Sequence, residues 1–98
     1  MNNKRVIIDA GHGGNDPGAV SGNLKEKDLT LQASKYMEKR LNELGIPTVM
    51  TRENDSSLPK DERISKVLNA HKGQPAILVA NHINAGGRVI KIVMNEIY

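Results

Sequence analysis

Apolar and polar positions follow two different periods along this chain of 98 residues. The short run 6–8 follows Lys4 and Arg5, is continuously apolar and is rich in β-branched residues, which is typical of a strand buried on both faces. Similar short runs at 46–52 and 76–84 predict two further strands. Three short buried strands are therefore expected, each well separated from the next.

Between these runs the period changes to that of an α-helix. From Lys25 onward apolar residues recur every three or four positions, and Gly45 follows the pattern as a helix C-terminal glycine does. The stripe of this first helix consists of Leu29, Ala33, Tyr36, Met37, Leu41 and Leu44. A second helix is predicted between the polar loop 53–62 and Gly73. Its stripe consists of Ile64, Val67, Leu68 and His71.

The order strand, helix, strand, helix, strand predicts an α/β fold with a mostly parallel sheet and flanking helices, because parallel neighbours need crossover connections. The segment 11–23 is rich in Gly, Asn, Asp, Pro and Ser and predicts a long loop. The tail 88–98 favours another strand, although its apolar residues would also line a helix. No repeat or linker interrupts the chain, so residues 1–98 are expected to form one domain.

Three polar residues converge in this topology. His12 follows the first strand and His82 lies at the end of the third, and the carboxyl ends of parallel strands meet at one edge of a sheet. Glu26 lies in the first turn of the first helix, on its core-facing stripe. Two imidazoles and a carboxylate are the ligands of a catalytic zinc site that leaves one position to water. The sequence therefore predicts Zn2+ at His12, Glu26 and His82.

Each candidate also has a structural interpretation. A histidine at a strand end is often only hydrogen bonded, and a glutamate in a first helical turn complements the helix dipole. Asp9 lies inside an apolar run and needs a partner, so it either anchors the loop or orients His12. His71 and Lys72 precede Gly73 and fit a cationic helix C-terminus, so His71 is left out of the site.

Composition narrows the chemistry. The chain has no cysteine, so a metal must use histidines and carboxylates. Its 14 Lys+Arg against 11 Asp+Glu give a net charge of +3, which suits an anionic polymer. The basic residues are scattered and the only aromatic residues are two Tyr, so no nucleic-acid partner is expected. No apolar run approaches the roughly 18 residues of a membrane span, so none is expected.

Six motifs follow one another: DAGHGG, DPGA, KEKDLTL opening a helix, TR closing a strand, ER beginning the next helix, and NHINA. From about residue 5 to residue 87 the chain resembles the zinc-dependent N-acetylmuramoyl-L-alanine amidases, the catalytic domains of bacterial autolysins and phage endolysins. The resemblance implies an α/β fold and His12, Glu26 and His82 as the zinc ligands. It also implies hydrolysis of the amide bond between N-acetylmuramic acid and L-alanine in peptidoglycan, a cell wall degradation activity.

The resemblance further implies a general-base glutamate near the end of a later strand, and the segment after NHINAGG does not resemble the family's continuation. We therefore expect a domain shortened at its C-terminal end, with Glu96 as the remaining acidic candidate for the catalytic base. The alternative function is a non-catalytic zinc-binding and peptidoglycan-binding module that lacks the base. A shortened domain would leave sheet surface exposed, which a homo-oligomer would cover.

Such an amidase acts at the bacterial cell wall. The start of the chain does not resemble a signal peptide, which fits cytoplasmic synthesis with release by lysis, or a trimmed chain. A third interpretation takes GHGGNDPGA as a glycine-rich phosphate cradle. The GxGxxG order and the Walker lysine are both missing, and the loop is long for such a turn, so a nucleotide is not expected.

Overall fold

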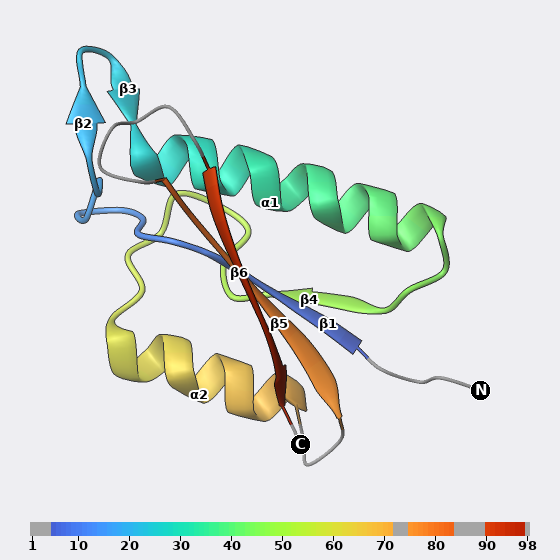
Figure 1. The fold of residues 1–98 in the computed structure, drawn as a ribbon. Coiled ribbons are helices and arrows are strands. Elements are labelled where there is room, and N and C mark those ends of the chain that lie inside the picture. The colour runs from blue at the N-terminus through green and yellow to red at the C-terminus, as the bar shows by residue number, and fades with distance from the viewer. Residues whose placement is uncertain (1–4, 72–74, 84–89, 98) are drawn as a thin grey trace.

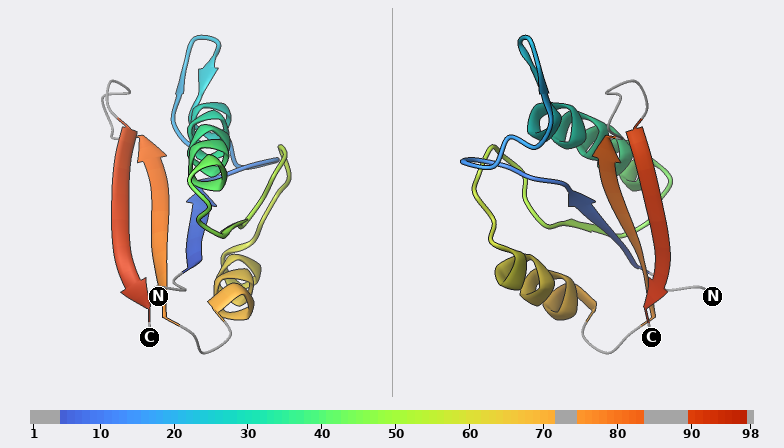
Figure 2. Two further views of the ribbon diagram at one scale, coloured as in Figure 1. Left: turned by 90° about the vertical axis from the view of Figure 1, so that its right-hand side faces the viewer. Right: turned by 60° about the vertical axis from the view of Figure 1, so that its left-hand side comes forward.

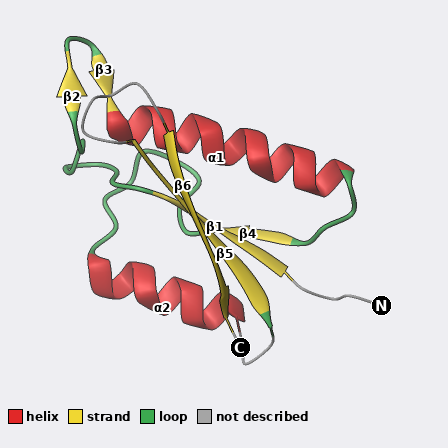
Figure 3. Ribbon diagram, viewed as in Figure 1, coloured by secondary structure: helices red, strands yellow, loops and turns green. Residues whose placement is uncertain are grey.

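The computed structural model describes residues 5–71, 75–83 and 90–97 of the chain (Figure 1). The elements, in chain order, are β1 (Arg5–Ala10), β2 (Val20–Ser21), β3 (Leu24–Lys25), α1 (Glu26–Glu43), β4 (Thr48–Met50), α2 (Lys60–His71), β5 (Ala76–Ile83) and β6 (Ile90–Ile97). Figure 3 shows the helices and strands, and β1, α1, β4, α2 and β5 follow the predicted order of strand, helix, strand, helix, strand. The hairpin of β2 and β3 was not predicted, since its residues lie in the segment expected to be a long loop.

Four strands form one sheet in the order β4-β1-β5-β6. The central strand β1 pairs in parallel with β4 and with β5, whereas β6 runs antiparallel to β5 (Figure 2). Ala10 at the end of β1 pairs with Asn81, so the carboxyl ends of β1 and β5 lie level at one edge. The mostly parallel sheet is confirmed, and the tail forms a strand as favoured.

Helices cover both faces of β1, which explains why its sequence is a continuous apolar run. On one face the buried cluster contains Val6, Ile8, Met50 and Val79, with Leu31, Met37 and Leu41 of α1 packed against it. On the other face the cluster contains Ile7, Ala70 and Ala76, with Val49, Val67 and Leu78 packed against it. Ile7 and Ile8 have no exposed surface, and each such burial contributes about 1.5–3 kcal/mol.

The apolar stripe predicted for α1 is only partly correct. Tyr36 and Leu44 are 65% and 64% exposed, so they do not belong to the core. The buried side chains of this helix are instead Glu26, Lys27, Thr30 and Ser34. The Thr30 hydroxyl donates to the Gly11 carbonyl at 2.7 Å, so this polar face of the helix serves the loop after β1.

The stripe of α2 shows a similar shift. Val67 packs against the core and Ala70 is buried, whereas Ile64 and Leu68 of the predicted stripe are 50% and 58% exposed.

The first helix ends where the sequence predicts, because Gly45 has a φ of 78° and its N–H donates a hydrogen bond back to the helix. In the described part of the chain, neither helix is both long and apolar enough to cross a membrane.

Candidate metal centre

The loop after β1 reverses direction at His12. This residue has a φ of 66°, in the left-handed region that side chains rarely adopt, and Gly13 and Gly14 follow with φ of 135° and 57°. The backbones of Gly13 and Asp16 exchange hydrogen bonds of 2.8 and 3.0 Å, which close a tight turn. The chain then passes through the β2–β3 hairpin and enters α1 at Glu26, which brings the first turn of α1 beside the end of β1.

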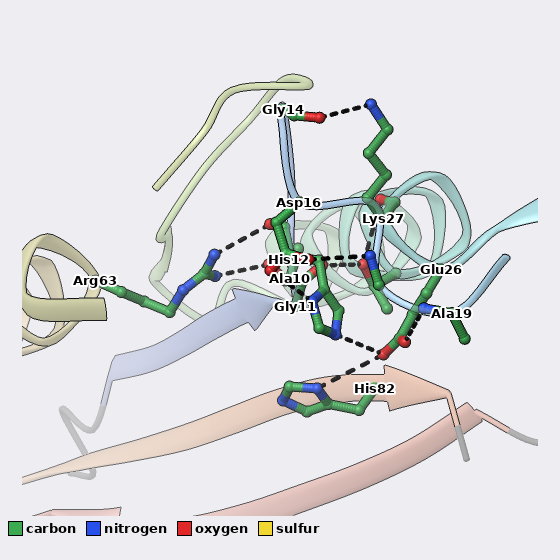
Figure 4. A network of polar contacts seen from close by, with 12 residues as sticks. Ala10, Gly11, His12, Gly14, Asp16, Ala19, Glu26, Lys27, Arg63 and His82 are labelled. Atoms are coloured by element: carbon green, nitrogen blue, oxygen red, sulfur yellow. Dashed lines mark hydrogen bonds and ion pairs between the residues drawn. The ribbon is translucent and has the colours of Figure 1, made fainter. Parts of the chain in front are cut away.

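Three side chains meet at this edge of the sheet (Figure 4). His12 Nε2 lies 3.1 Å from Glu26 Oε2, and His82 Nδ1 lies 3.8 Å from the same oxygen. Each residue offers one ligand atom, and these atoms lie within 4.8 Å of one another. The structure thus brings together the three residues expected to bind the metal, one from a loop, one from α1 and one from β5.

The distances from the two imidazoles to Glu26 Oε2 fit a shared cation. Nδ1 of His12 lies 2.8 Å from a carboxylate oxygen of Asp16, so its N–H is assigned as the donor there, and the lone pair of the neutral ring lies on Nε2. That lone pair faces Glu26 Oε2, and the two repel unless a proton or metal ion lies between them. Two ligands of a tetrahedral zinc stand about 3.4 Å apart, given bonds of about 2.0–2.1 Å. The two observed distances, 3.1 and 3.8 Å, lie on either side of that value.

Asp16 is the carboxylate that orients His12. Its Oδ2 accepts from His12 Nδ1, and its Oδ1 accepts from the Gly18 N–H at 3.1 Å. These hydrogen bonds, that of His12 first, hold the pKa of Asp16 below its ordinary value. Such an outer carboxylate fixes both the tautomer and the direction of a ligating histidine. Asp16 was not predicted from the sequence, where its place in the DPGA motif was the available signal.

Asp9 has the anchoring role, one of the two roles expected for it from the sequence. Its Oδ1 accepts from the Thr51 hydroxyl at 2.8 Å and from Arg63 Nη1 at 2.5 Å. Because this carboxylate lies within β1, these contacts anchor the strand end to the segment after β4 and to α2. The structure therefore supports the interpretation of Asp9 as an anchor, while Asp16 orients the imidazole of His12.

Two glycines form the closest walls of the centre. A Cβ on Gly11 would lie 2.8 Å from His82 Nδ1, and a Cβ on Gly18 would lie 2.7 Å from both Glu26 Oε1 and His12 Cδ2. Side chains do not tolerate such approaches, and Gly18 also has a φ of 70°. Glycine at both positions therefore leaves room for the imidazoles and the carboxylate.

The cluster is buried at its carboxylate and open at its imidazoles. The side chain of Glu26 is 7% exposed, against 28% for His12 and 42% for His82. The Ala19 N–H donates to Glu26 Oε1 at 3.0 Å, which holds one oxygen and leaves the other facing the rings. A buried carboxylate needs such partners, and the open side leaves the ligand atoms within reach of a large substrate.

A further carboxylate beside the loop is also engaged. Asp55 accepts from Lys27 Nζ and from the Gly14 N–H, both at 2.8 Å. The hydrogen bond from Lys27, followed by that from Gly14, lowers the pKa of Asp55. Among the described residues, the group of candidate metal ligands contains no carboxylate besides Glu26. This cluster therefore adds no carboxylate to the candidates for the catalytic base.

Glu96, the expected substitute for that base, lies in β6 with its side chain outside the described part of the chain. The antiparallel register pairs Glu96 with Ile77, whereas His82 pairs with Lys91. Five residues along a strand correspond to about 16 Å, so the backbone of Glu96 lies near the opposite end of β5 from His82. This register speaks against Glu96 as the catalytic base.

A sequence profile described as N-acetylmuramoyl-L-alanine amidase matches residues 6–90. The chain belongs to this family. The uncharacterized protein YqiI of Bacillus subtilis (strain 168) is 42% identical over 83 residues, which are 85% of this chain and 39% of that protein. The germination-specific N-acetylmuramoyl-L-alanine amidase of the same organism is 45% identical over 58 residues, which are 59% of this chain and 24% of that protein.

A solved member of the family shares the fold. The N-acetylmuramoyl-L-alanine amidase from Clostridium difficile 630 superposes with a TM-score of 0.73 at 34% identity, covering 85% of this chain and 45% of that one. The match confirms the family membership that the six motifs indicated and the α/β fold. The present chain spans less than half the length of each of these three family relatives.

Proposed function

We propose that this chain is the metal-binding part of a zinc-dependent N-acetylmuramoyl-L-alanine amidase that hydrolyses the bond between N-acetylmuramic acid and L-alanine in peptidoglycan. The main support is the meeting of one ligand atom each from His12, Glu26 and His82 within 4.8 Å, in a chain that belongs to the amidase family. The net charge of +3 suits an anionic wall polymer as substrate. The site of action would be the bacterial cell wall.

Zinc suits this donor set, since two histidines and one carboxylate hold it in hydrolytic enzymes with a position left for water. When bound, the ion supplies a water with a pKa lowered toward 7 and a Lewis acid for the scissile carbonyl. The protein prepares the ligands for it. Asp16 keeps the His12 lone pair on Nε2, and the Ala19 N–H holds Glu26 so that Oε2 faces the rings. The side chain of His82 is 42% exposed, which leaves this side of the centre partly open to a substrate.

Hydrolysis also needs a group that accepts the water proton and passes it to the leaving amine. Three carboxylates near the loop, those of Asp9, Asp16 and Asp55, are each held by hydrogen bonds to other groups. This favours, as a second candidate, a module that binds zinc and peptidoglycan without turnover. The two candidates share the metal centre and differ only in the release of product.

Metal analysis and muropeptide hydrolysis test the proposal together. The purified chain should hold one zinc and release stem peptide, and chelation should abolish both. His12→Ala and His82→Ala should each abolish stoichiometric zinc, and Glu26→Ala should weaken its binding, because each removes a ligand. His71→Ala, at the end of α2, is the matched control and should retain zinc.

Two results would contradict the assignment of the centre: equal loss of zinc from His71→Ala, or a folded parent chain that binds no zinc. Zinc-dependent binding of muropeptide without release of stem peptide would favour the binding module over the enzyme. Zinc-dependent release would favour the enzyme, whatever group supplies the base.

A further inference from the structure

Three successive carbonyl groups, from the last residue of β1 to His12, accept hydrogen bonds from two arginines. Arg52 donates from Nε to the Ala10 carbonyl at 3.1 Å and from Nη2 to the Gly11 carbonyl at 3.0 Å. Arg63 donates from Nη1 to the Ala10 carbonyl at 2.8 Å and from Nη2 to the His12 carbonyl at 3.0 Å. The two guanidinium groups and these three carbonyls are termed the carbonyl clamp.

Arg52 follows β4 and is 2% exposed. Its other donors are satisfied too, because Nη1 donates to the Asn54 carbonyl at 2.9 Å and Nη2 donates to the Lys27 carbonyl at 2.9 Å. Burial, and after it the charge of Arg63, lowers the pKa of the Arg52 guanidinium. A guanidinium nevertheless remains protonated at neutral pH. Burying a cation beside another cation costs free energy, and the hydrogen bonds from Arg52 to the backbone carbonyls offset that cost.

Arg63 reaches the loop from α2. In Figure 4 it approaches from the left, while Glu26 lies on the right of His12. Its Nη1 also pairs with Asp9 at 2.5 Å, so the same guanidinium binds β1 and the loop at once. Through this one side chain the position of α2 is connected to the backbone of a candidate metal ligand.

The carbonyl clamp surrounds a residue whose backbone conformation is unfavourable by itself. His12 has a φ of 66°, and a left-handed conformation costs a residue with a side chain about 1–2 kcal/mol. Such a conformation persists when the surrounding structure holds it in place. Arg52 holds the carbonyl before the His12 Cα, and Arg63 holds the carbonyl after it. Fixing both flanking peptide groups fixes the direction of the Cα–Cβ bond, and with it the path of the imidazole toward Glu26.

We propose that Arg52 and Arg63 are positioning residues of the metal centre, which lock the left-handed backbone of His12 and so hold its Nε2 at the ligand position. The proposal rests on the zinc function proposed above. It adds that α2, which contributes no ligand to the described cluster, contributes to metal affinity through Arg63. Lysine is no substitute, because a single ammonium group cannot span two carbonyls in the way that the planar guanidinium does.

Arg63→Lys tests this directly, since it keeps the positive charge near Asp9 and removes the two-pronged contact. In the full chain, zinc affinity measured by competition with a chromophoric chelator should fall about 10–100-fold, the range for outer partners of metal ligands. The absorption of the cobalt(II)-loaded protein should change as well, because ligand geometry changes. Circular dichroism should still show a folded chain.

Arg5→Lys is the matched control. Arg5 lies at the other end of β1 and donates to the Ala70 carbonyl near the end of α2 at 2.8 Å, so it also anchors α2 but touches no residue of the loop. Zinc affinity should stay within twofold of the parent value. If Arg63→Lys does not fold, Arg63→Gln, whose side-chain amide keeps one N–H donor group, replaces it in the same comparison.

Two outcomes would overturn the proposal: zinc affinity within twofold of the parent in a folded Arg63 variant, or an equal loss in Arg5→Lys. A measurement on the metal-free protein distinguishes failure of this proposal from failure of the zinc function. If the parent binds no zinc, the zinc function fails. The clamp is then supported if Arg63→Lys, but not Arg5→Lys, speeds amide exchange at Gly13 and Asp16 and shifts the ring resonances of His12. It is overturned if neither observable changes.

Discussion

The two histidines of the candidate centre reach the same point by different means. His82 lies within β5, where its backbone pairs with Lys91 of β6. His12 lies beyond the end of β1 at a φ of 66°, and its Nδ1 is bound to Asp16. Regular strand geometry places His82, whereas contacts within and around one loop place His12.

This difference indicates where the centre is sensitive. The ladder of hydrogen bonds sets the direction of a strand, so His82 should tolerate changes in most neighbouring side chains. A left-handed loop residue depends on each donor around it, so His12 should not. Substitutions near the end of β1 should therefore reduce metal affinity out of proportion to stability. Substitutions near the end of β5 should reduce metal affinity only where the new side chain collides with the His82 ring.

The largest effect is expected from Gly18→Ala. The new Cβ would lie 2.7 Å from both Glu26 Oε1 and His12 Cδ2, at a φ of 70°, so it displaces two ligands together. Zinc affinity should fall about 100-fold, the upper end of what outer changes cost. Gly11→Ala meets only His82, at 2.8 Å, and should cost about tenfold because the exposed ring of His82 can swing away. Chelator competition on both variants measures the contrast.

Gly22→Ala is the control for strain without collision. Gly22, at the tip of the hairpin, also has a positive φ, 59°, but a Cβ there meets nothing within 4 Å. It should lose about 1–2 kcal/mol of stability and keep its zinc affinity. Equal losses of affinity in Gly22→Ala and Gly18→Ala would mean that backbone strain, and not crowding of the ligands, governs the centre.

The same contrast separates what the sequence could predict from what it could not. The central strand was readable because burial on both faces leaves a continuous apolar run over 6–8. From the parallel topology it followed that His12 and His82 share one edge of the sheet. Neither inference needs side-chain detail, because both depend on rules of sheet geometry that hold for any loop.

Periodicity predicted the buried side of α1 only in part. Apolar spacing predicted Tyr36 and Leu44 in the core, yet both are largely exposed. In the N-terminal half of the helix, beside the site, the buried face is polar, because Thr30 donates to the Gly11 carbonyl and Ser34 accepts from Asn81. The buried side of α1 begins polar and ends apolar, so it shows no single hydrophobic period. Met37 and Leu41 of the predicted stripe therefore pack against the core, whereas Tyr36 and Leu44 do not.

The contacts of the loop were also beyond sequence reasoning. The φ of His12 is held by side chains 40 and 51 positions further along the chain, those of Arg52 and Arg63. The motifs TR and ER marked these arginines, but only the packing of α2 and the segment after β4 against β1 shows which carbonyls they bind. Long-range hydrogen bonds of this kind leave no local period to detect.

A smaller effect is expected from Asp16→Asn, which keeps the shape of the side chain and removes its charge. The weaker acceptor at His12 Nδ1 should lower zinc affinity about tenfold or somewhat less. Asp28→Asn makes the same change of charge at an exposed position in the first turn of α1, and should leave affinity within twofold. Equal losses of zinc affinity in the two variants would mean that the charge of Asp16 acts at long range and that its contact with the His12 ring does not matter.

The smallest effect is expected from Asp55→Asn, which loosens the outer side of the loop without touching a candidate ligand. Hydrogen bonds from Lys27 and the Gly14 N–H hold the pKa of Asp55 below its ordinary value of 3.8 in the folded chain. A carboxyl group with a lowered folded pKa adds stability above its unfolded pKa, and this is lost as pH falls through the folded value. In metal-free buffer the melting temperature of the parent should therefore exceed that of Asp55→Asn slightly at pH 7, and the gap should close below about pH 4. A gap that stays constant from pH 7 to pH 3 would show that the carboxylate charge does not hold the loop.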